Sequence, residues 1–165
     1  MEVVQTRWQH VVEELYQGEV LGEALFNRML RDLDDDRERY VVGSLLQLET
    51  ETKVLLRRAA AARGLRLDED DAPRTEGEEI AASLRAMTWL GKMQRLQAGI
   101  SDYYLPRYQL IAAEAGADDR EVTSLMVRHE TALLEVLARE TAGQIETSLI
   151  PLEGHLRFPL SHPPG

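Results

Sequence analysis

Residues 8–30 read WQHVVEELYQGEVLGEALFNRML, and the spacing of apolar side chains in this stretch decides the fold class. The apolar residues recur every three or four positions on two adjoining stripes, which is the pattern of an amphipathic helix that buries one face. The same pattern extends to residues 3–33, so we expect one helix about 46 Å long at 1.5 Å per residue.

The rest of the chain shows the same helical spacing, which predicts an all-α fold. Each further segment starts at a capping box, in which the first side chain caps the helix and a Glu three residues later completes the pair. We expect Gly64 and Gly116 to end two of the helices, because glycine readily adopts the left-handed conformation that follows helix ends. The capping pairs are Asp35–Glu38, Thr75–Glu78 and Asp118–Glu121. The predicted helices cover residues 3–33, 36–63, 76–115 and 119–145.

The third segment is too long to match its neighbours. Forty residues of helix would measure about 60 Å, so we expect this segment to be bent or broken at Gly91, Gly99 or Pro106. The part that pairs with the last helix is then about 89–115, and residues 64–88 become a long connection with a short helix of its own. This predicts two helical hairpins joined by a crossover, while an up-down-up-down bundle fits the same pattern.

Composition excludes several classes of function. The 165 residues contain no cysteine, which excludes disulfides, thiolate metal sites and a cysteine nucleophile. The net charge of −10 disfavours binding to nucleic acid or to an anionic membrane. No stretch suggests a signal peptide or a membrane span, so we expect a cytoplasmic location. Residues 1–150 should form the bundle, and the proline-rich tail 151–165 should lie across it or engage a protein partner.

Acidic and histidine side chains on the apolar stripes are the unusual feature of the sequence. They are Glu19 and Glu23 in the first helix, Glu49 in the second, and His129 and Glu130 in the last. A buried carboxylate costs several kcal/mol unless a metal, a base or a proton neutralises it. At 1.5 Å per residue, all of these residues except Glu19 lie about 18 to 21 Å along their helices from the nearest hairpin turn. We therefore expect these side chains to converge at the midplane of the bundle.

The predicted architecture, together with GEVLGE (18–23), LETET (48–52) and RHETALLEVLARE (128–140), resembles the ferritin-like superfamily. In that superfamily, four-helix bundles bind two metals through carboxylates and Glu-x-x-His motifs. The resemblance covers about residues 3–145 and implies a metal-carboxylate protein that uses iron or manganese in redox, oxygen or peroxide chemistry. No complete Glu-x-x-His motif is present, so a single metal fits better than a pair. By position, the implied ligands are Glu23, Glu49, His129 and Glu130, with Glu19 as a further candidate and Thr52 and Tyr104 as supporting residues.

A second interpretation needs no metal. Glu49 can pair with Lys53 four residues later, and His129 can be a hydrogen-bonded core histidine. The protein would then be a helical interaction module, and no motif in the chain identifies a catalytic reaction. Under either interpretation we expect a homodimer, because Gly18 and Gly22 allow close helix approach, within the hairpin or at a dimer seam.

Overall fold

The computed structural model describes residues 2–161. Within this range the chain is helical and contains no β-strand, which confirms the all-α class. No helix in the same range is both long enough and apolar enough to cross a membrane. The helices are α1 (Glu2–Asp32), α2 (Asp36–Ala61), α3 (Asp71–Leu84), α4 (Trp89–Gly99), a π-helix (Ile100–Tyr104), α5 (Leu105–Ala113), α6 (Arg120–Thr141) and a 3-10 turn (Ile150–Leu152).

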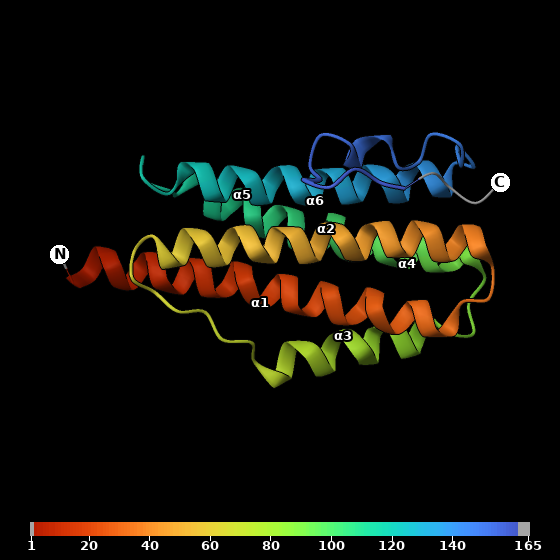
Figure 1. The fold of residues 1–165 in the computed structure, drawn as a ribbon, viewed down its shortest axis with the longest axis horizontal. Helices are drawn as coiled ribbons and strands as arrows, with labels where there is room; N and C mark the ends of the chain where they lie inside the picture. The colour runs from red at the N-terminus through yellow and green to blue at the C-terminus, as the bar shows by residue number, and fades with distance from the viewer. Residues whose placement is uncertain (1, 162–165) are drawn as a thin grey trace.

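The helices form two antiparallel hairpins joined by a crossover (Figure 1). Helices α1 and α2 make the first hairpin, and the α4–α5 rod makes the second with α6. Helix α3 lies on the outer side of α1 and runs along it, so that α2 and α4 begin at the same end of the molecule (Figure 1). The structure therefore has the crossover arrangement rather than the up-down-up-down alternative.

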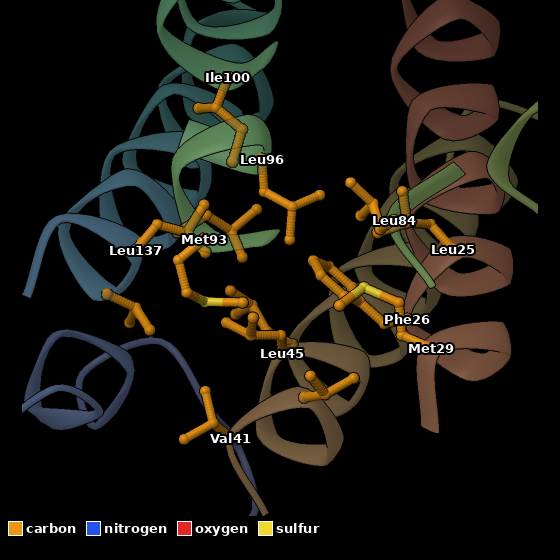
Figure 2. Packing of buried hydrophobic residues seen from close by; sticks show 14 of the residues in the cluster. Leu25, Phe26, Met29, Val41, Leu45, Leu84, Met93, Leu96, Ile100 and Leu137 are labelled. Carbon is orange, nitrogen blue, oxygen red and sulfur yellow. The ribbon is translucent and has the colours of Figure 1, made fainter. Parts of the chain in front are cut away.

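The buried apolar side chains divide into two clusters along the bundle. One cluster contains the end of α1, the start of α2 and the end of α6, as Figure 2 shows for Met29, Leu45 and Leu137. The other contains the start of α1, the end of α2 and the start of α6, including Trp8 and Leu56. The layer between the clusters holds buried acidic and histidine side chains.

The start of α2 follows its predicted capping box, because the Asp35 carboxylate accepts a hydrogen bond from the Glu38 N–H at 2.9 Å. Gly64 has a φ of +71°, so it supplies the expected left-handed residue after α2. Two other predicted boxes are wrong, since α3 begins at Asp71, before Thr75, and the N-terminus of α6 has no side-chain cap. Gly116 is not left-handed; the second left-handed glycine is Gly143, which follows α6.

The long third segment is interrupted in two ways. Residues 85–88 separate α3 from α4, and the Thr88 hydroxyl caps α4 by accepting from the Gly91 N–H at 3.2 Å. Further along, the helix widens into a π-helix, where the Leu105 N–H bonds to the Ile100 carbonyl, five residues back. Pro106 lies directly after this turn and has no N–H to close an ordinary helical bond. Proline therefore shifts the hydrogen-bond register here instead of breaking the rod.

The C-terminal segment lies along α2 and α6 (Figure 1). Leu152 in the 3-10 turn is completely buried in the first cluster. Beyond it, the Glu51 carboxylate accepts from the backbone N–H groups of Arg157 and Phe158, and Gln47 donates to the Phe158 carbonyl at 2.8 Å. The part of the tail that the structure describes is thus fastened to the outer face of α2.

Candidate metal centre

Three side chains from three helices meet in the polar layer between the two apolar clusters. Glu19 comes from α1, Glu49 from α2 and His129 from α6, and all three are buried. The His129 Nε2 atom lies 3.4 Å from Glu19 Oε2 and 3.6 Å from Glu49 Oε1. One ligand atom from each residue lies within 4.8 Å of the other two, close enough to share one metal ion.

Glu130 places another carboxylate beside these three residues, although it is not one of the set whose ligand atoms all lie within 4.8 Å of one another. It follows His129 on α6, and its Oε1 atom lies 3.9 Å from His129 Nε2. Its side chain is also buried. The centre therefore combines three carboxylates with one imidazole, the oxygen and nitrogen donor set that suits iron, manganese or zinc.

Burial and mutual repulsion shift the titration of these groups. Burial raises the pKa of Glu19 well above its ordinary value, and the neighbouring Glu49 carboxylate raises it further. Burial also raises the pKa of Glu130 to about 7, although His129 opposes this rise. For His129, burial alone would lower the pKa, but the charges of Glu49 and Glu130 outweigh that effect and raise it. Burial is therefore the main cause of the raised pKa values of the two carboxyl groups, whereas neighbouring carboxylates are the cause of the raised pKa of the imidazole.

Thr52 orients the histidine. Its hydroxyl lies 3.0 Å from His129 Nδ1, and both side chains are buried. If Nδ1–H donates to the Thr52 oxygen, Nε2 carries a free lone pair that faces the carboxylates. Hydrogen bonds of this kind from a second residue fix the tautomer of metal-binding histidines. Thr52, which the sequence suggested as a supporting residue, therefore lies in direct contact with His129.

Two atoms at the centre have no hydrogen-bond partner among the described residues. They are Glu19 Oε2 and His129 Nε2, the pair separated by 3.4 Å. A buried polar atom without a partner costs about 1 to 3 kcal/mol, so native structures rarely leave one unexplained. Two ligand atoms that each lie about 2.1 Å from one metal ion are about 3.0 Å apart in octahedral geometry and about 3.4 Å apart in tetrahedral geometry, so this separation lies at the upper end of that range.

Glycines on α1 make room for the site. A Cβ atom on Gly22 would lie 2.6 Å from the Glu49 carboxylate, and one on Gly18 would collide with the Tyr108 hydroxyl. The sequence suggested that these glycines lie either in the hairpin contact or at a dimer seam. In the structure, Gly22 lies in the hairpin contact with α2, while Gly18 faces α5. Neither glycine lies on an outward-facing seam.

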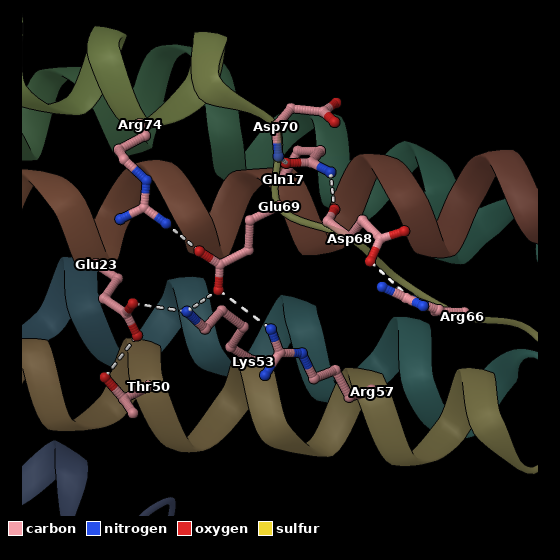
Figure 3. A network of polar contacts seen from close by, with 10 residues as sticks. All are labelled: Gln17, Glu23, Thr50, Lys53, Arg57, Arg66, Asp68, Glu69, Asp70 and Arg74. Atoms are coloured by element: carbon pink, nitrogen blue, oxygen red, sulfur yellow. Dashed lines mark hydrogen bonds and ion pairs between the residues drawn. The ribbon is translucent and has the colours of Figure 1, made fainter.

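The structure does not bring Glu23 into the centre. The Glu23 carboxylate instead accepts from Lys53 Nζ at 2.6 Å and from the Thr50 hydroxyl at 2.8 Å. Lys53 also pairs with Glu69 of the crossover at 2.6 Å, so these residues form a separate ionic network (Figure 3). Lys53 therefore pairs with Glu23 and Glu69 and not with Glu49, in contrast to the metal-free interpretation.

The tyrosines differ in their relation to the centre. Tyr103 is 64% exposed, while Tyr104 is half-buried and lines a cavity next to Glu49 and Glu130. Burial raises the pKa of Tyr104, and burial also raises that of Tyr108, with smaller contributions from the glutamates of the centre. Both tyrosines therefore keep their protons beside the carboxylates. The sequence indicated Tyr104 but gave no reason to separate Tyr108 from ordinary core residues.

Comparisons of the chain with protein-family models, with curated proteins and with solved structures found no match.

Proposed function

We propose that this chain is a ferritin-like metal-carboxylate protein in which Glu19, Glu49, Glu130 and His129 bind one redox-active divalent metal, iron or manganese. The observation that supports this most directly is the facing pair of unpartnered atoms, Glu19 Oε2 and His129 Nε2. A cation bound between them would satisfy both and would offset the repulsion among the three carboxylates.

The residues around the centre fit this role. Thr52 orients the imidazole, and Gly22 leaves the space that the Glu49 carboxylate occupies. The apolar clusters on either side limit access of water, which strengthens electrostatic interactions inside. When bound, iron or manganese supplies a change of redox state that supports chemistry with oxygen or peroxide.

The test is a set of thermal melts on protein purified without a histidine tag, with and without manganese or ferrous iron. A metal that binds only the folded state adds about 2.7 kcal/mol of stability at a hundredfold excess over its dissociation constant. We expect wild type to show this increment and Glu49→Gln to lose it. The metal-free Glu49→Gln protein should be at least as stable as wild type, because one of the repelling charges is gone.

Glu23→Gln is the matched control, since Glu23 lies on the same helix as Glu19 but faces Lys53. This variant should keep the full increment from metal, although losing the ion pair lowers its starting stability. A wild-type melting temperature that does not change with metal in excess would contradict the proposal. That result would instead favour a metal-free helical interaction module.

A further inference from the structure

A cavity of about 140 Å³ adjoins the candidate centre. Glu49, Glu130 and Tyr104 form its polar inner part, and Arg95 of α4 is the exposed member of its lining. Most of the remaining wall is apolar, from α1, α4, the π-helix and α6; Figure 2 labels several of these side chains. The apolar wall includes Leu25, Phe26, Leu96, Ile100 and Leu133.

The size of this cavity limits what can enter it. An apolar cavity of about 150 Å³ inside a protein is large enough to hold benzene. A single aromatic ring, or a branched aliphatic group of that size, therefore fills the space. Because Glu49 and Glu130 line the cavity, a molecule in it would lie next to the centre.

Charge decides how a ligand would be oriented. The carboxylates at the inner end repel an anionic group, whereas the Arg95 guanidinium at the exposed side attracts one. Within residues 7–161, Arg95 forms no ion pair with another side chain, so its charge is available. Arginine binds carboxylates in a bidentate way, and such charge-assisted hydrogen bonds are the strong ones.

We propose that the cavity binds a small aromatic carboxylic acid, with the ring between the apolar walls and the carboxylate on Arg95. The ring would then lie beside Glu49 and Glu130, so that its role as a substrate rests on the proposed metal function. Binding itself requires no metal. The two proposals can therefore fail independently.

The test measures binding of 4-fluorobenzoate to the metal-free 165-residue protein by calorimetry and by fluorine NMR. We expect saturable binding of one molecule per chain, and binding of neutral 4-fluorobenzyl alcohol that is roughly tenfold weaker or more. In Arg95→Gln, the affinity for 4-fluorobenzoate should fall to that for the alcohol, and the affinity for the alcohol should not change. Arg128→Gln, at an exposed arginine of α6 outside the cavity, is the control and should change neither affinity.

Gly99→Leu tests the location of the ligand. Gly99 lines the cavity, has helical dihedral angles, and an added Cβ would meet no atom within 4 Å. The variant should therefore fold, keep the metal increment and lose at least tenfold in affinity for both ligands, because leucine fills the space. Absent binding in wild type, or binding that neither Arg95→Gln nor Gly99→Leu weakens, would overturn the inference. Ligand binding without any metal increment would instead refute the metal function alone.

Discussion

At the scale of single residues, the site is a group of charges that burial makes unfavourable. Burial raises the pKa of Glu130 to about 7, and it raises the pKa of Glu19 as well. The metal-free folded protein therefore binds protons that the unfolded chain releases at neutral pH. Because folding takes up protons here, stability of the metal-free protein must fall as pH rises.

The first prediction concerns this pH dependence. The pKa of a glutamate in the unfolded chain is about 4.3. The raised pKa of Glu130 alone should therefore lower the unfolding free energy of the metal-free protein by about 3 kcal/mol between pH 4 and pH 8. The raised pKa of His129 acts in the same direction, since its proton stabilises the fold only at lower pH. Urea unfolding of Glu130→Gln at pH 5, 6, 7 and 8 should show a flatter profile than wild type. Identical slopes would mean that Glu130 does not titrate in this range.

The second prediction concerns the contact between Thr52 and His129. Thr52→Val keeps the shape of the side chain but removes the hydroxyl 3.0 Å from Nδ1. We expect metal affinity to fall about 10- to 100-fold, because the imidazole loses the group that fixes its tautomer. Thr50→Val is the control: its hydroxyl, on the same helix, bonds to Glu23 outside the centre. Equal metal dissociation constants for Thr52→Val and wild type would remove Thr52 from the site.

At the scale of helices, the sequence predicts which faces carry the site but not their register. Glu49 and His129 could be found because each interrupts an apolar stripe. Glu19 and Glu23 lie on the same face of α1, one turn apart, and counting residues from the hairpin tip favoured Glu23. A helix turn is about 5.4 Å, and the packing of α1 against α2 brings Glu19 to that level instead. The residue that could have distinguished the two glutamates is Lys53, because a buried lysine pairs with the glutamate that faces it, here Glu23.

The third prediction tests the close approach of α1 and α2 at the site. A methyl group on Gly22 would lie 2.6 Å from the Glu49 carboxylate, so Gly22→Ala must displace that side chain. We expect weaker metal binding and a loss of stability of about 1 to 3 kcal/mol, typical of overpacking. Gly43→Ala is the matched control, because a Cβ there meets nothing within 4 Å. That variant should gain up to about 1 kcal/mol from helix propensity and bind metal normally, as guanidinium unfolding and metal titration would show.

At the scale of the whole molecule, the crossover is held to the first hairpin partly through charge. The segment between α2 and α3 carries Glu69, which pairs with Lys53 and is also contacted by Arg57 and Arg74 (Figure 3). The sequence predicted an exposed connection here and gave no partner for its acids. Pairing across the chain depends on where the crossover lies, which residue spacing does not specify. Gly18 and Gly22 face inward and do not support a dimer seam at α1, and a sedimentation measurement tests the predicted homodimer.

The last prediction follows from this anchor. The Lys53 side chain is only 8% exposed and bridges Glu23 and Glu69 at 2.6 Å each. In Lys53→Met, the methionine retains most of the apolar stem but leaves Glu23 without its cation. Removing one member of a buried ion pair costs about 3 to 5 kcal/mol of stability. Because both glutamates are about one-fifth exposed, we expect Lys53→Met to lose roughly 2 kcal/mol of unfolding free energy.

Arg66→Met is the control for that experiment, because the ion pair between Arg66 and Asp68 is mostly exposed and contributes little. Hydrogen exchange should be faster in residues 62–84 of Lys53→Met, where the crossover loses its anchor, and unchanged in α6. The metal increment should persist, since Lys53 does not contact the centre. Equal unfolding free energies for Lys53→Met and Arg66→Met would show that packing of α3 on α1, and not the ion pair, holds the crossover in place.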